Sequence, residues 1–199
     1  MTKVDNIKVI IERPDFDWYE EMVKSSTFGK KITKDQREVF IKKAMEQAEK
    51  FKNKLISEYG NKEPMGYIIT FDIPLEYKKE EPTYGYQYLG YYRTKNKSIA
   101  VNYTTLNLIQ KKCKEKGFNE VEIDKIKDTV LMHELFHYLE DLFPSDYTKE
   151  KHFETKTFGL FKSKINLSII SEITAVHFSK LMTKLKHSPK VYEYIYKKY

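Results

Sequence analysis

The stretch His133-Glu134-Leu135-Phe136-His137 lies within a segment that has the pattern of an α-helix, with apolar residues recurring at helical spacing on both sides of it. Successive residues of a helix turn by about 100°, so the two histidines lie on adjacent turns and project about 40° apart. Two neutral imidazoles at that separation can bind one ion. The pattern therefore predicts a Zn²⁺ site on this helix.

Glu134 directly follows the first histidine and lies on the same side of the predicted helix. A carboxylate that does not bind the metal can take a proton from metal-bound water and later pass it to a leaving amine. We therefore expect Glu134 to be the catalytic general base of an enzyme that hydrolyses peptide bonds in a protein or peptide substrate.

A catalytic zinc normally has three protein ligands and one position for water. The metzincin arrangement, with glycine and then histidine after the second histidine of the motif, is excluded because Glu140 and Phe143 stand at those positions. Glu172 is the best third ligand. It lies early in the next amphipathic helix, where Ala175 one turn later allows close approach to the first helix. We expect these three metal ligands: His133, His137 and Glu172.

His152 is the alternative third ligand, although it lies in a charged run that is typical of a solvated surface. His177 and His187 are weaker candidates. His177 follows Glu172 by five residues and faces away from it on a helix, so a partly exposed histidine without a metal is expected there.

These residues resemble the motif of the small gluzincins, in which HExxH is followed by a helical Glu ligand. Over residues 66–185, the order of strands, hairpin and helices is similar to the minimal zincin core of the ImmA/IrrE-type bacterial and phage metallopeptidases. The lethal-factor-like peptidases share the arrangement Glu172-x-x-Ala175-x-x-Phe178. The resemblance implies a zinc-dependent metallopeptidase. With His152 as the third ligand, the spacing would instead resemble the SprT-like peptidases, which act near DNA.

Two positions depart from these families. Phe136 stands where they usually have glycine, and Val176 replaces an acid that orients the first histidine in some gluzincins. Asp141, one turn beyond His137, could supply part of that support. The departures leave a second hypothesis open, in which the chain is a non-catalytic zinc-binding regulatory or protein-binding module on a zincin scaffold.

Length and composition limit the other possible functions. The 199 residues suit one domain, residues 1–199. The formal net charge is +7, but only Arg13, Arg37 and Arg93 are arginines among the 36 basic residues, which argues against sequence-specific recognition of nucleic acid. Cys113 is the only cysteine, and we find neither a secretion signal nor an apolar stretch that could cross a membrane. We therefore expect a cytoplasmic protein.

The chain is expected to be an α+β protein with a minimal zincin-like fold, in which a small, twisted, mainly antiparallel sheet packs against the active-site helix, with further helices N- and C-terminal. The β-rich runs predict strands at residues 6–12, 66–73, 87–93 and 98–103, the last two joined as a hairpin. Capping and periodic signals predict helices at residues 33–60, 104–116, 119–143 and 168–186, a short helix after Pro189, and a helix or turn at 15–28. A long loop is expected at 143–167.

The predicted strand at residues 98–103 precedes the active-site helix, in the order expected of an edge strand that binds an extended peptide by strand addition. Tyr84, Tyr86 and Tyr147 are candidates for the side chain that stabilises the transition state, because each could reach the site from a loop.

Overall fold

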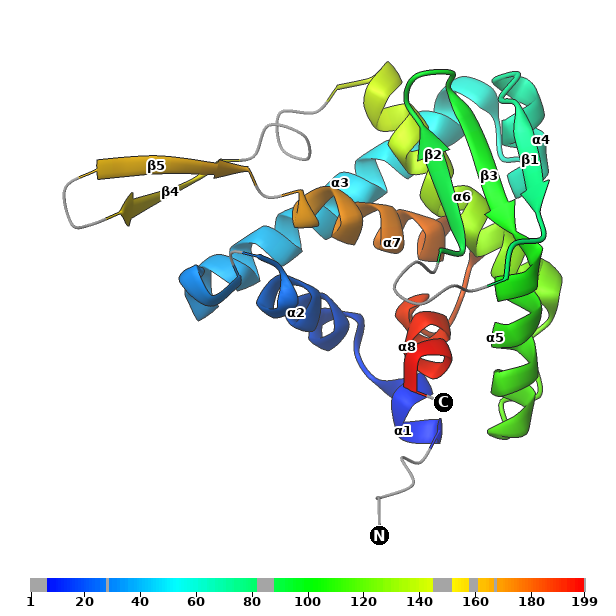
Figure 1. The fold of residues 1–199 in the computed structure, drawn as a ribbon. Helices are drawn as coiled ribbons and strands as arrows, with labels where there is room; N and C mark the ends of the chain where they lie inside the picture. Colours follow the sequence, from blue (N-terminus) through cyan, green and yellow to red (C-terminus); the bar gives the residue numbers. More distant parts are fainter. Residues whose placement is uncertain are drawn as a thin grey trace, which may run out of the picture.

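The computed structural model describes residues 7–27, 29–81, 88–144, 152–157, 161–166 and 168–198, with the backbone alone for 152–157 and 161–166. Helices make up most of the described chain, which has a mixed α+β architecture (Figure 1). The helices are α1 (Ile7–Glu12), α2 (Asp15–Ser25), η1 (Gly29–Lys31), α3 (Lys34–Tyr59), α4 (Pro64–Thr70), α5 (Tyr103–Glu115), α6 (Ile123–Leu142), α7 (Ile169–Thr183) and α8 (Lys190–Lys198). The strands are β1 (Leu75–Lys78), β2 (Gly90–Arg93), β3 (Ser98–Asn102), β4 (His152–Thr157) and β5 (Phe161–Asn166).

The main sheet has three strands in the order β1-β3-β2. The predicted hairpin is confirmed, because β2 and β3 pair antiparallel with Tyr91 opposite Ala100. β1 pairs with β3 in parallel, so the sheet is mixed rather than mainly antiparallel. All five residues of β3 are buried between its two neighbours. The expectation that this strand lies at the edge is therefore wrong, and the edge strand next to the candidate site is β2.

Two segments that were expected to be strands are helices. In α1, Ile10 is buried and Ile7 and Ile11 pack against the core, whereas Val9 is 65% exposed. This spacing suits a helix, whereas a strand would place Val9 on the same face as its two neighbours at positions 7 and 11. The isoleucines and the valine of α1 thus form a helix, although such β-branched residues favour strands. The burial of one face of the helix outweighs this preference.

The second of these segments is α4, which was expected to be part of a strand at residues 66–73. Pro64 occupies the start of the helix, where its missing N–H costs nothing. Tyr67 and Ile68 are buried and Ile69 is 72% exposed, which again follows helical spacing. The Tyr67 hydroxyl donates a 2.8 Å hydrogen bond to the carbonyl oxygen of Gly60 and so joins α4 to the end of α3. The strand of this region is β1, which begins after the helix.

The other helix predictions are confirmed with small shifts. Thr33 and Gln36 form the predicted capping box of α3. α6 begins at Ile123 after Glu122, not at Asn119, and the helix after residue 167 ends at Thr183. The expected loop at residues 143–167 contains the antiparallel pair β4 and β5.

The core lies around α6. β2 and β3 contact one side of this helix and α7 contacts another, while α3 packs along α7 (Figure 1). Two elements far apart in sequence, α6 and α7, thus run side by side with the edge strand next to them. This arrangement positions the candidate site.

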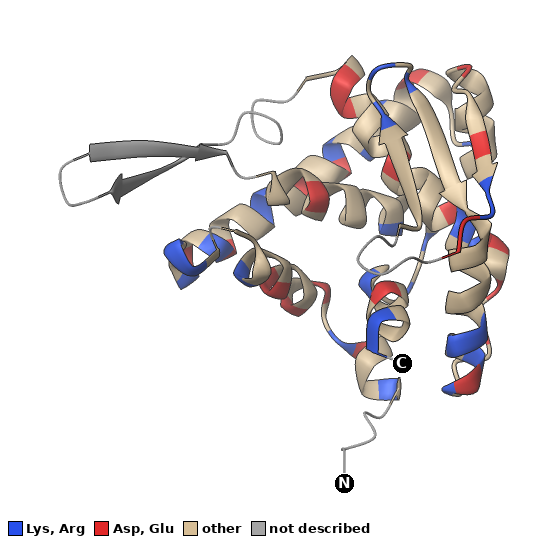
Figure 2. Ribbon diagram, in the orientation of Figure 1, with Lys and Arg blue, Asp and Glu red and all other residues tan. Residues whose placement is uncertain are grey.

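Charged residues of both signs are spread over the helices. Figure 2 shows Lys and Arg spread over α1, α3, α5 and α8, and not gathered on one described element. Among the described residues, no helix is both long enough and apolar enough to cross a membrane.

Candidate metal centre

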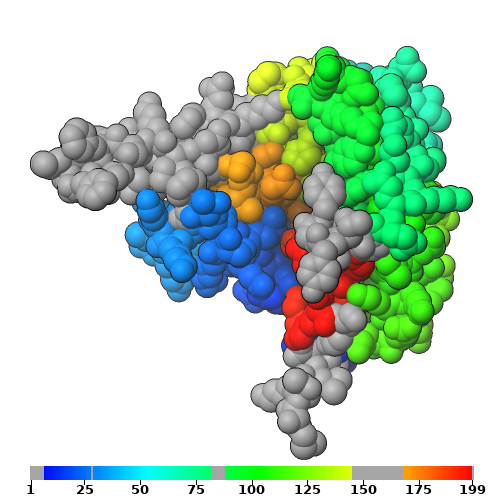
Figure 3. Space-filling view, viewed as in Figure 1, coloured from blue at the N-terminus to red at the C-terminus, as the bar shows by residue number. Residues whose placement is uncertain are grey.

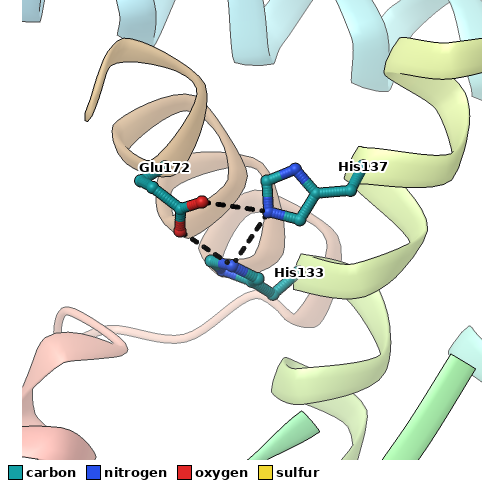
Figure 4. Close-up of side chains that lie close together, drawn as sticks. All are labelled: His133, His137 and Glu172. Carbon is teal, nitrogen blue, oxygen red and sulfur yellow. Dashed lines mark hydrogen bonds and ion pairs between the residues drawn. The ribbon is translucent and has the colours of Figure 1, made fainter. Parts of the chain in front are cut away.

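Three side chains from two helices converge at one point. His133 and His137 lie on adjacent turns of α6, and Glu172 lies in the first turn of α7 (Figure 4). The Nε2 atoms of the two rings are 3.3 Å apart. Glu172 Oε2 lies 3.4 Å from His133 Nε2, and Glu172 Oε1 lies 3.6 Å from His137 Nε2. The structure therefore brings together all three residues that the sequence predicts as metal ligands.

These separations are longer than most direct hydrogen bonds. An N–H···O hydrogen bond has its most frequent length at about 2.9–3.0 Å, shorter than all three distances. Ligand atoms about 2.0–2.1 Å from a tetrahedral zinc are separated by about 3.3 Å, which is the edge of the tetrahedron. The donor set of two imidazoles and one carboxylate is also one that zinc accepts. The three residues thus have donor atoms of the types that zinc accepts, and one donor atom of each lies within 4.8 Å of the others.

The site is open on one side. The side chains of His133 and His137 are 23% and 19% exposed, and that of Glu172 is 49% exposed. In Figure 3 the first turns of α7 reach the surface between α2 and the end of α6. The three side chains can therefore be reached from solvent.

The charges of the site stabilise one another. Burial acts against ionisation of Glu172, but the hydrogen bond and charge of His133 and the charge of His137 outweigh it and hold the Glu172 pKa at about 2. Glu172 is thus a carboxylate at neutral pH, as a metal ligand must be.

Glu134, the expected general base, is buried beside the histidines and does not belong to the cluster of three. Burial raises the pKa of its carboxyl group, while the two histidines and a hydrogen bond from the backbone N–H of Tyr92 partly offset that effect. Tyr92 belongs to the edge strand β2. The carboxylate of Glu134 therefore lies between the metal-binding face of α6 and the strand.

A cleft passes over the three residues. On one side a cavity of about 540 Å³ is lined by β2, His137 and Asp141. On the other side a cavity of about 350 Å³ is lined by Leu89, Val130 and Val176. Both cavities include the following four residues: Gly90, His133, Glu134 and Glu172. The cleft thus extends in both directions from the candidate metal position.

Glu140, and not Asp141, is the acid that the structure places behind His137. Glu140 is 3% exposed, and its Oε2 lies 3.7 Å from His137 Nδ1. Ser171 donates a 2.7 Å hydrogen bond from its hydroxyl to the same oxygen. Both Glu140 and Asp141 line the larger cavity of the cleft. Sequence reasoning missed Glu140, although its position three residues after His137 already placed both on one helical face.

The two departures from the resembled families have structural roles. Phe136 is fully buried and packs against Phe51 of α3 and Phe178 of α7, with ring centroids 5.1 and 5.7 Å away. The large side chain thus fills the space between three helices, on the side of α6 away from the cleft. Val176 is buried and lines the cavity on the other side of the metal position.

The remaining histidines lie apart from the cluster or outside the description. His177 is 5% exposed, and its Nδ1 is 3.1 Å from the hydroxyl of Tyr19, so the expectation of a partly exposed side chain is wrong. His177 lies in the interface between α7 and α2, and the packing of these two helices buries its ring. His187 contacts Phe118 and Tyr192 in another part of the molecule.

Several predicted residues lie outside the described part of the chain. The side chain of His152, which belongs to β4, is not described. The candidate transition-state residues Tyr84, Tyr86 and Tyr147 also lie outside the described residues.

Comparison of the chain with protein-family models, with curated proteins and with solved structures found no match.

Proposed function

We propose that the chain is a zinc-dependent metallopeptidase that hydrolyses peptide bonds of a protein or peptide substrate. The observation that carries this proposal is the convergence of the donor atoms of His133, His137 and Glu172 within 4.8 Å of one another, with the separate carboxylate of Glu134 beside them. The resemblance of the motif to that of the small gluzincins supports the same assignment. Three ligands with one open position are typical of a catalytic rather than a structural zinc.

When bound, zinc supplies Lewis acidity, which polarises a carbonyl group and lowers the pKa of water. The residues of the chain supply the rest of the chemistry. His133, His137 and Glu172 hold the ion, and Glu134 accepts the proton of the attacking water and later delivers it to the leaving amine. The backbone N–H of Tyr92 interacts with the Glu134 carboxyl group and favours its ionised form.

We assign the peptide substrate to the cleft along β2. This strand pairs with β3 on one side only within the described sheet, so its other edge can pair with an extended peptide. The two cavities that meet at Glu134 and Glu172 would receive side chains from the two sides of the scissile bond. Leu89, Val130 and Val176 form an apolar part of the smaller cavity that could receive an aliphatic side chain, while Lys190 and Glu193 line another part of it. A cytoplasmic location accords with the single buried cysteine, Cys113.

Substitution of Glu134 by Gln tests the proposal. The amide cannot accept the proton, so hydrolysis should fall by at least about 10²-fold, while the zinc content stays at one ion per chain. The assay is digestion of a broad peptide library followed by mass spectrometry, with zinc quantified by elemental analysis. Full activity of Glu134→Gln would refute the mechanism. Bound zinc without cleavage of any peptide by the unaltered protein would favour the non-catalytic zinc-binding module instead.

A further inference from the structure

We infer that Glu140 is a positioning residue that aligns two of the three metal ligands through a single carboxylate oxygen. The inference rests on the proposed metal site, but on none of its catalytic chemistry. Oε2 of Glu140 accepts the 2.7 Å hydrogen bond from Ser171 and lies 3.7 Å from Nδ1 of His137. One of these residues is a ligand, and the other immediately precedes the ligand Glu172.

The first half of the argument concerns the ring of His137. Its Nε2 faces His133 and Glu172, so binding of an ion at this atom leaves the proton of the neutral ring on Nδ1. That N–H needs an acceptor, and Oε2 of Glu140 lies on its side of the ring. At 3.7 Å this contact is electrostatic rather than a hydrogen bond.

The second half concerns α7. Ser171 is next to Glu172, so its hydrogen bond to Glu140 ties the first turn of α7 to the last turn of α6. The turn that is held in this way carries the third ligand. One oxygen therefore fixes both the orientation of a ring on α6 and the distance of the carboxylate on α7.

The burial of Glu140 supports a role beyond packing. A carboxylate that is 3% exposed at a helix interface costs free energy unless charged or hydrogen-bonding partners compensate. A hydroxyl and an imidazole are such partners, and a bound cation beyond the imidazole would add a favourable charge. The arrangement has the form of a carboxylate–histidine–metal relay, in which loss of the outer carboxylate typically weakens metal binding by about 10–100-fold.

The test compares zinc affinities of Glu140→Gln, Ser171→Ala and the matched control Asp141→Asn with that of the unaltered protein. Asp141 is the neighbouring acid, so its substitution removes the same charge from the same end of α6 while Glu140 and its contact with His137 Nδ1 stay in place. Competition with a chromophoric chelator measures the zinc dissociation constant. The visible spectrum of the Co²⁺-substituted protein reports ligand geometry, and urea unfolding of the metal-free proteins reports stability.

We expect Glu140→Gln to weaken zinc binding by about 10–100-fold and to change the Co²⁺ spectrum. Ser171→Ala should change the same two readouts to a smaller degree, and Asp141→Asn should stay within about threefold of the unaltered protein. Unchanged affinity and spectrum in Glu140→Gln would overturn the inference, as would an equal loss in Asp141→Asn. A purely structural role would lower the unfolding free energy alone. If the unaltered protein binds no zinc, both the proposed function and this inference fail. If the unaltered protein and Glu140→Gln bind zinc with equal affinity, only this inference fails.

Discussion

A methyl group on the Cα of Gly90 would lie only 2.5 Å from Cγ1 of Val130, so the edge strand β2 touches the helix α6, which carries the two histidines of the candidate site. The same methyl group would lie 3.0 Å from the carbonyl oxygen of Ala100 and 3.4 Å from Cγ of Glu134. Glycine at this position is what allows the strand to approach the expected general base. Two residues later, the backbone N–H of Tyr92 interacts with that carboxyl group and lowers its pKa.

Gly90→Ala should therefore separate β2 from α6. We expect a loss of about 1–3 kcal/mol in the free energy of unfolding, as in other overpacked sites, together with a fall in peptidase activity. Gly66→Ala is the matched control, because its methyl group would meet only the side chain of Lys62, at 3.2 Å or more. Urea denaturation should place the control within about 1 kcal/mol of the unaltered protein. Equal effects of the two substitutions would contradict the role assigned to Gly90.

The third metal ligand can be identified by zinc quantification after dialysis. Glu172→Ala should lower the zinc affinity by more than the roughly 10–100-fold that loss of an outer-sphere partner costs, because an inner ligand is removed. His152→Ala should retain one zinc ion per chain. Loss of zinc in His152→Ala with retention in Glu172→Ala would reverse the assignment and favour the alternative ligand.

Phe136→Ala should lower the free energy of unfolding by about 3–5 kcal/mol, because the ring is fully buried between Phe51 and Phe178. Phe136→Leu, which keeps most of the buried surface, should cost less. Thermal or urea unfolding of the metal-free proteins measures both. A loss below about 1 kcal/mol in Phe136→Ala would show that packing does not explain why phenylalanine stands at this position of the motif.

Stability should fall in mild acid because of His187. Burial, aided by the charge of Lys180, lowers the pKa of this ring from 6.5 to about 4, and its Nε2 has no hydrogen-bond partner among the described residues. Above pH 6.5 the ring is neutral in both the folded and the unfolded chain. Between pH 6.5 and 4 the unfolded chain takes up a proton that the folded chain does not, so stability decreases as the pH falls.

Comparison with His187→Gln isolates this effect. Both proteins should be unfolded by urea in the presence of a chelator, so that metal release from His133 and His137 does not contribute. The midpoint of the unaltered protein should fall more steeply from pH 6.5 to 4 than that of the variant. Parallel curves would show that His187 is not the group responsible.

Local signals in the sequence were enough to predict much of this protein. The capping box at Thr33, the hairpin between β2 and β3 and the helix that carries His133 and His137 each depend on residues within a few positions of one another. Their spacing and capping fix the backbone locally, so each could be recognised without the rest of the chain.

The tertiary structure alone decided features that depend on distant partners. β3 became the central strand because β1 pairs with it in parallel, which leaves β2 at the edge beside Glu134. Glu140 rather than Asp141 lies next to Nδ1 of His137, because adjacent residues of a helix point in different directions and only one of the two can face α7. The same packing brings Glu172 within 3.4 Å of His133. The residue types in the sequence indicate which side chains could bind a metal or support a ligand. Their contacts depend on the packing of segments far apart in the chain, which local periodicity does not encode.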